Sequence, residues 1–212
     1  MTQDIRICFF GDSFVNGTGD ETGLGWVGRL CAAANRNRLI TYYNLGIRRN
    51  TSKDLLLRWE QECAIRLPDF CDGRVVISCG VNDTVIEGGK LRIHPEESVA
   101  NVREILIKAK KFRVLMVGPP CIGEEVQDAR IQAVSTAFSR ESEALGVPYI
   151  DLFTQLSSDE AYKREVSSND SAHPGSVGYS KIAEIIGSSP SWWFYEPQQQ
   201  KKCNASRIAT HQ

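Results

Sequence analysis

Short apolar segments alternate with amphipathic helical segments along most of this chain, and this alternation limits its fold more than any other feature. Five segments are apolar over consecutive positions, as buried strands are: residues 5–10, 40–45, 75–79, 114–117 and 148–152. Apolar residues recur at helical spacing in residues 26–35, 52–67, 97–111, 125–145 and 176–186. Strands that are apolar on both faces are typical of a parallel sheet covered on both sides. The pattern predicts an α/β protein, a three-layer α/β/α sandwich with a flavodoxin-like, doubly wound parallel sheet of about five strands.

Polar clusters follow the predicted strands. Gly-Asp-Ser at 11–13 comes after the first strand, Asn-Leu-Gly at 44–46 closes the second, and Gly-Val-Asn-Asp at 80–83 follows the third. Asp170 and His173 come after the fifth strand, in the loop before the last helix. In doubly wound sheets, ligands bind outside the carboxyl ends of the strands. We therefore expect these clusters to converge at one edge of the sheet.

The chain of 212 residues fits a single domain with a substantial core. No interdomain linker or internal repeat is visible. We expect a folded domain over residues 1–195 and a polar, disordered tail over residues 196–212. The aromatic run Trp-Trp-Phe-Tyr at 192–195 stands just before that tail. We expect these side chains to cover an edge of the core rather than to contact lipid.

Charge and cysteine content disfavour several classes of protein. The 25 basic and 26 acidic residues give a formal net charge of −1, whereas nucleic-acid binding normally requires a basic face. No apolar run approaches the ~20 residues that span a bilayer, and the N-terminus lacks the features of a signal peptide. The seven cysteines are scattered without C-x-x-C spacing, which argues against a disulfide framework and against a zinc site. We expect a reduced, cytoplasmic protein, and the sequence leaves its oligomeric state open.

A serine and a histidine stand at two of the strand-to-helix junctions. Ser13 ends the first polar cluster, and His173, one of three histidines, has Asp170 three residues before it. Serine, histidine and aspartate are the parts of an acyl-transfer enzyme, and their arrangement recurs on unrelated folds. Each part also has a structural interpretation, since Gly-Asp-Ser is a common turn sequence and Ser176 could cap the helix that follows. Their joint placement at such junctions favours the catalytic interpretation.

Four clusters, in this order, resemble the sequence blocks of the SGNH hydrolases, also called GDSL-type esterases and lipases. The resemblance spans residues 5–187, with Phe14 in place of the leucine that gives the family one of its names. The stretch Gly-Leu-Gly-Trp at 23–26 is also similar to many members. The four blocks are Gly11-Asp12-Ser13-Phe14, Asn44-Leu45-Gly46, Gly80-Val81-Asn82-Asp83 and Asp170-Ser171-Ala172-His173-Pro174.

The resemblance implies a serine hydrolase that acts on a small acyl ester and needs neither metal nor cofactor. It implies Ser13 as the nucleophile, His173 as the base and Asp170 as the residue that orients His173. It further implies an oxyanion hole formed by the backbone N–H groups of Ser13 and Gly46 and by the side-chain amide of Asn82. Taken alone, Asn82 could equally be a turn residue that satisfies local backbone. The other three blocks favour its catalytic role.

The segment after Gly46 departs from the family pattern. Many members have a small residue and then a glycine where this chain has Arg48 and Arg49. Guanidinium groups bind carboxylate and phosphate through paired hydrogen bonds, so these arginines predict a substrate with an anionic group near the ester. The alternative is that both are solvated residues ahead of the helix at Ser52.

Three functions remain open at this point. The first is an esterase that cleaves a small acyl ester or thioester. The second is a carbohydrate O-deacetylase or an acyltransferase with the same triad. The third is a flavodoxin-like binding module that holds a phosphate in the loop at 11–19, but this loop has neither a G-x-x-x-x-G-K-[ST] nor a G-x-G-x-x-G pattern.

Overall fold

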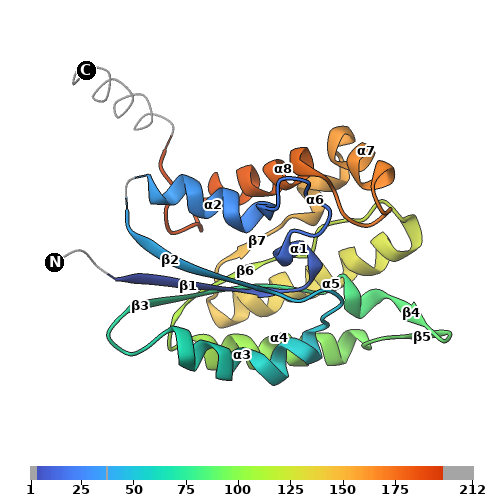
Figure 1. The fold of residues 1–212 in the computed structure, drawn as a ribbon. Helices are drawn as coiled ribbons and strands as arrows, with labels where there is room; N and C mark the ends of the chain where they lie inside the picture. The colour runs from blue at the N-terminus through green and yellow to red at the C-terminus, as the bar shows by residue number, and fades with distance from the viewer. Residues whose placement is uncertain (1–3, 37, 198–212) are drawn as a thin grey trace, which may run out of the picture.

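The computed structural model describes residues 4–36 and 38–197. It contains a five-stranded parallel sheet between two layers of helices, as the sequence predicts (Figure 1). The strands lie in the order β2-β1-β3-β6-β7, which is the flavodoxin-like arrangement. They are β1 (Ile5–Gly11), β2 (Ile40–Gly46), β3 (Asp72–Ser78), β6 (Arg113–Val117) and β7 (Tyr149–Ile150).

The helices divide between the two faces of the sheet. In Figure 1, α2 and α8 lie together on one face, α3 and α4 lie on the other, and α5 packs against α4. The helices are α1 (Ser13–Asn16), α2 (Gly25–Asn35), α3 (Ser52–Arg66), α4 (Pro95–Ala109), α5 (Glu125–Leu145), α6 (Phe153–Ser157), α7 (Glu160–Ser168) and α8 (Ser176–Gly187), with a short 3-10 helix, η1 (Asn82–Thr84).

Strand β1 shows why a continuous apolar run suits the centre of this sheet. Ile7 and Phe9 belong to the core beneath α2 and α8, whereas Cys8 and Phe10 belong to the core beneath α3 and α4. Successive side chains of a strand point to opposite faces, so such a run is buried on both sides. Each large apolar side chain buried in this way contributes about 1.5–3 kcal/mol.

The chain after α8 closes one of these cores. Trp192 and Phe194 are buried against the core beneath α2 and α8, and Trp193 packs against it, so the prediction that the aromatic run covers its edge is confirmed for these three, whereas Tyr195 is exposed. The predicted tail falls largely on residues 198–212, which lie outside the described residues. Within the described part of the chain, no helix is long and apolar enough to cross a membrane.

Several boundaries differ from the sequence prediction, and the helices α6 and α7 are not predicted; two of the differences have a clear local cause. The last strand is expected over 148–152, but β7 covers only Tyr149–Ile150 because Leu152 already precedes the first turn of α6. The helix expected over 97–111 begins two residues earlier, at Pro95. Proline suits the first position of a helix, since its fixed φ is helical and its missing N–H would have no partner there.

A small hairpin that the sequence analysis does not predict extends past the carboxyl ends of the main strands (Figure 1). It consists of β4 (Ile86–Glu87) and β5 (Lys90–Leu91), which pair in antiparallel fashion. Gly88 and Gly89 connect them with φ angles of 58° and 77°. A two-residue turn with positive φ at both positions favours glycine, so the Gly-Gly pair is the signal for this hairpin.

Candidate active site

Ser13 is the first residue of α1, directly after β1. The turn between them is tight, because a Cβ at Gly11 would collide with the carbonyl oxygen of Ser78 on β3. The side chain of Asp12 caps α1 by accepting a hydrogen bond from the N–H of Phe14 (2.9 Å). This strand-to-helix turn places the Ser13 hydroxyl at the carboxyl edge of the sheet.

The structure brings Ser13, His173 and Asp170 into one hydrogen-bonded row. Ser13 Oγ lies 2.7 Å from His173 Nε2, and His173 Nδ1 lies 2.7 Å from Asp170 Oδ2. The other carboxylate oxygen of Asp170 accepts the backbone N–H of His173 (2.7 Å) and that of Ala172 (3.0 Å). The loop therefore folds so that two residues three positions apart face each other.

The electrostatics of this row favour an ionised Asp170. Partial burial raises the pKa of Asp170, but the hydrogen bonds from the backbone and ring of His173 outweigh it, so the pKa lies below its ordinary value. A carboxylate that stays ionised can hold the Nδ1 proton of the imidazole, which leaves Nε2 free to accept the Ser13 proton. Both Ser13 and His173 are more than nine-tenths buried.

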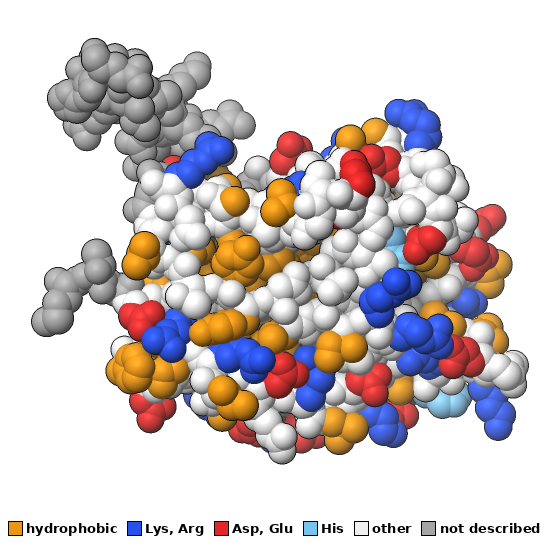
Figure 2. Space-filling model, viewed as in Figure 1, with side chains coloured by type: hydrophobic (Ala, Val, Ile, Leu, Met, Phe, Trp, Pro, Cys, Tyr) orange, Lys and Arg blue, Asp and Glu red, His pale blue; other side chains and the backbone are white. Residues whose placement is uncertain are grey.

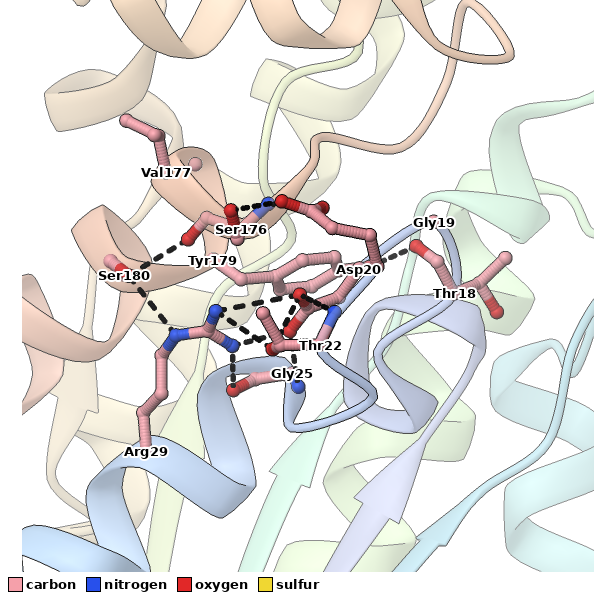
Figure 3. A network of polar contacts seen from close by, with 12 residues as sticks. Thr18, Gly19, Asp20, Thr22, Gly25, Arg29, Ser176, Val177, Tyr179 and Ser180 are labelled. Atoms are coloured by element: carbon pink, nitrogen blue, oxygen red, sulfur yellow. Dashed lines mark hydrogen bonds and ion pairs between the residues drawn. The ribbon is translucent and has the colours of Figure 1, made fainter.

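A buried polar network ties the loop after α1 to α8 (Figure 3). Asp20 accepts hydrogen bonds from the N–H of Thr22 (3.0 Å), from the N–H of Gly25 (2.7 Å) and from the Arg29 guanidinium. Arg29 Nε in turn donates to Ser180 Oγ on α8 (3.0 Å). Burial raises the pKa of Asp20, but these donors, with Arg29 foremost, lower it to about 2. We call this group of five residues the Asp20 clamp.

Further hydrogen bonds join the same loop to the histidine loop. The hydroxyl of Tyr179 on α8 donates to the carbonyl of Thr18 (2.7 Å) (Figure 3). The side-chain amide of Asn169 donates to the carbonyl of His173 (3.1 Å) and lies 3.4 Å from that of Gly19. These contacts fix the relative position of Ser13 and His173, which are 160 residues apart in the chain.

Asn82 is the first residue of η1, and both ends of its side-chain amide have partners. Its Nδ2 donates to Asp12 Oδ2 (3.2 Å), and its Oδ1 lies 3.5 Å from a guanidinium nitrogen of Arg92. Asp12 is itself buried, which raises its pKa to about 7, with a further contribution from Asp83. Asn82 therefore contacts the residue that directly precedes Ser13, and both lie at the same edge of the sheet.

The comparison with protein families decides the identity of the chain. The model of the GDSL-like lipase/acylhydrolase family matches residues 9–181. The chain belongs to this family. It is accordingly a carboxylic ester hydrolase, and this membership does not support the third function, a phosphate-binding module. A comparison with curated proteins gave no match.

Solved structures share the fold of this GDSL-like hydrolase at low sequence identity. Axe2, an acetylxylan esterase from Geobacillus stearothermophilus, is 21% identical with a TM-score of 0.68, covering 87% of this chain and 93% of its own. A lipase/acylhydrolase from Enterococcus faecalis is 23% identical with a TM-score of 0.72, covering 86% and 93%. LAE5, an alpha/beta hydrolase enzyme from the metagenome of Lake Arreo in Spain, is 21% identical with a TM-score of 0.72, covering 93% and 99%.

The surroundings of Gly46 bear on the oxyanion role predicted for its N–H, which stays a prediction. The backbone N–H of Gly46 donates to Asn44 Oδ1 (3.1 Å), so it is not a free donor. A Cβ at Gly46 would collide with the backbone nitrogen of Asn16 and lie 2.7 Å from the carbonyl oxygen of Asp12. A glycine is needed here because β2 approaches α1 closely, so packing alone already requires it.

The two arginines after Gly46 differ in their surroundings. Arg49 forms an ion pair with Glu87 of the hairpin and has a φ of 67°, in the left-handed region that favours glycine. Arg48 is exposed and forms no ion pair with another described residue. Figure 2 shows Lys and Arg side chains gathered on this side of the molecule, between the regions of α1 and the hairpin. The hairpin residue Arg92, which contacts Asn82, was not singled out from the sequence.

Other candidate binding features lie elsewhere. Among residues 4–36 and 38–197, no three His, Cys, Asp or Glu side chains are grouped so that they could hold a metal ion. A cavity of about 370 Å³ lies between α2 and α8, with Arg38, Trp192 and Phe194 in its wall. It includes Arg29 and Ser180 of the Asp20 clamp but neither Ser13 nor His173. The cavity therefore lies apart from the hydrogen-bonded row of Ser13, His173 and Asp170.

Proposed function

We propose that this GDSL-like hydrolase cleaves small acyl esters through a triad of Ser13, His173 and Asp170. The row of two 2.7 Å contacts between these side chains is the observation that carries the proposal. Ser13 Oγ attacks the ester carbonyl as His173 Nε2 takes its proton, and the same proton then goes to the departing alcohol. Water cleaves the resulting acyl-enzyme with His173 again as the base. Asp170 holds the imidazole in the required tautomer throughout.

The oxyanion of the tetrahedral intermediate needs donors that are free or can exchange a partner for it. The N–H of Ser13 is at the first position of α1, where a helix has no internal acceptor for it. The Asn82 amide has two hydrogens, and only one is required by Asp12. We propose these two groups as oxyanion donors together with the N–H of Gly46, which would exchange its 3.1 Å contact with Asn44 Oδ1 for the oxyanion.

We propose a broad substrate class and, within it, a narrower one. The general proposal is a short acyl group on an alcohol or a thiol. The narrower one is an O-acetyl group on a carbohydrate, favoured by the name of the structural neighbour Axe2, an acetylxylan esterase. Arg48, exposed at the site edge, would favour substrates with an anionic group near the ester, whereas Arg49 already has Glu87 as its partner.

A labelling experiment tests the triad. A fluorophosphonate should label Ser13 alone, and Ser13→Ala should abolish both labelling and ester turnover. Ser135 provides a matched control, because it is equally buried and its hydroxyl contacts only Tyr149, away from the row. Ser135→Ala should therefore keep both properties. Labelling at another residue, or turnover by Ser13→Ala, would refute the assignment.

A substrate panel then separates the ester classes. Aryl esters, acyl-CoA thioesters and acetylated xylo-oligosaccharides should be compared by kcat/KM, with acyl chains of graded length. Preference for the acetylated sugars would support the deacetylase, and preference for thioesters would exclude it.

A further inference from the structure

Arg92 links the hairpin to the proposed oxyanion site. It follows β5, and its backbone N–H donates to the carbonyl of Val85 (2.9 Å), which closes the hairpin at its base. Its side chain is 17% exposed and points inward rather than to solvent, with one guanidinium nitrogen 3.5 Å from Asn82 Oδ1. A second nitrogen donates to the carbonyl of Arg49 (2.9 Å). One planar group therefore spans two segments at the edge of the site.

The amide of Asn82 is held between the carboxyl group of Asp12 and the guanidinium of Arg92. The Asp12 carboxylate accepts from Nδ2, and the Arg92 guanidinium faces Oδ1. If the amide were flipped, its NH2 group would face the guanidinium, donor against donor, and its oxygen would face Asp12 Oδ2, which repels it whenever Asp12 is ionised. Asp12 and Arg92 thus favour the orientation in which the second Nδ2 hydrogen of Asn82 remains available to the oxyanion.

We propose that Arg92 is a positioning residue that orients and polarises the Asn82 amide toward the oxyanion, an inference that rests on the proposed role of Asn82. At 3.5 Å the contact is mainly one of charge with dipole, since good hydrogen bonds between N and O are shorter. A cation at the amide oxygen draws electron density from Nδ2 and strengthens it as a donor. This effect grows as negative charge develops on the substrate oxygen, so it acts on kcat.

Glu87 partly neutralises the positive charge of Arg92 but leaves its contact with Asn82 in place. Arg92 Nε lies 3.7 Å from a carboxylate oxygen of Glu87, which also pairs with Arg49. The Nε edge of the guanidinium faces this exposed acid, whereas its two terminal nitrogens face Asn82 and Arg49. Only arginine can make these three contacts at once, because its guanidinium has three nitrogens whereas a lysine side chain has one.

A double-mutant cycle on the full-length enzyme tests the inference. Asn82→Ala should lower kcat by about 10²–10³, as expected for loss of one oxyanion donor. Arg92→Ala should lower kcat about tenfold with KM within about twofold, as for a group that acts only in the transition state. In the Asn82→Ala background, Arg92→Ala should cause no further loss, because the group through which it acts is gone.

Arg130→Ala is the matched control. Arg130 donates to the carbonyl of Thr84, in the same short segment as Asn82, but not to the Asn82 amide. Its loss should leave kcat within about twofold, whereas a general loosening of this segment would affect both arginine variants. If Arg92→Ala does not fold, Arg92→Lys replaces it in the same cycle, with an expected loss of about threefold.

The possible failures are distinguishable. If Asn82→Ala keeps full kcat, the oxyanion role in the proposed function is wrong and the role of Arg92 is wrong with it. If Asn82→Ala loses activity but the two losses multiply in the double variant, only the inference about Arg92 is overturned. An Arg92→Ala enzyme with normal kcat and a raised KM for anionic esters would make Arg92 a substrate-binding residue instead.

Discussion

Removal of Arg29 should destabilise the protein through the Asp20 clamp. The carboxylate of Asp20 is fully buried and Arg29 is only 16% exposed, so Arg29→Ala leaves a buried charge without its ionic partner. Such losses cost about 3–5 kcal/mol. Three donor groups remain on Asp20, namely both donors of Thr22 and the N–H of Gly25. These place the expected loss at the low end of the range, about 3 kcal/mol.

The pKa of Asp20 gives a second measure of the same clamp. A pKa of about 2 in the folded state, against an unfolded value of about 3.9, corresponds to about 2–3 kcal/mol. Because the folded pKa is lowered, this stabilisation is present above about pH 4 and is lost as the pH falls through about 2. For a chain of this length, a loss of 2–3 kcal/mol corresponds to a decrease in Tm of about 4–12 °C.

Urea denaturation of wild type and Arg29→Ala at pH 7 and pH 3, followed by circular dichroism, measures this loss. The difference in unfolding free energy should be about 2–3 kcal/mol at pH 7 and smaller at pH 3. Arg103→Ala is the control, since the pair of Arg103 with Glu141 is half exposed and should contribute less than about 1 kcal/mol. A loss below about 1 kcal/mol for Arg29→Ala, or one equal at both pH values, would refute the reasoning.

Three further predictions concern residues of the site. The pKa of about 7 at Asp12 is raised by burial, so the folded protein should lose up to about 4 kcal/mol between pH 4 and pH 8, and urea titrations of Asp12→Asn should lack this loss. Gly46→Ala should lower Tm sharply or prevent folding, because its Cβ would collide with the backbone of Asn16; soluble Gly46→Ala enzyme with an unchanged melt would contradict this packing role. Arg48→Ala should raise KM for anionic esters by about twofold to fivefold, the range of an exposed ion pair, and an equal rise for neutral esters would remove Arg48 from substrate binding.

The sequence predicts the central strands β1, β3 and β6 well because they are buried over most of their length. Residues such as Phe9 and Phe10 pack on opposite sides of the sheet, so local hydrophobicity alone identifies β1. The β4–β5 hairpin is different, since Ile86 and Glu87 are both exposed. Two-residue strands outside the core leave no hydrophobic signal, and only the turn glycines indicate the hairpin.

The sequence predicts those candidate site residues whose side-chain type is suited to one chemical role. Ser13, Asp170 and His173 meet as predicted, because three histidines leave few candidates for the base and the end of β1 marks one serine among many. The packing role of Gly46 is not predicted, because a glycine required by a close backbone approach cannot be distinguished in sequence from one required at a substrate. Arg92 was missed because its contact with Asn82 depends on the hairpin, which brings together residues ten positions apart.

The long separation between Ser13 and His173 has a consequence for synthesis of the protein. At about 5–20 residues per second, a ribosome adds the 160 residues between them in roughly 10–30 s. Throughout that time the nascent chain carries a serine without a base, and α2 lacks the helix α8 that packs against it. A chain stalled before His173 would not react with a fluorophosphonate. With the proposed triad, hydrolytic activity therefore requires the loop that follows α7 as well as all five strands of the sheet, and shorter products should not cleave esters.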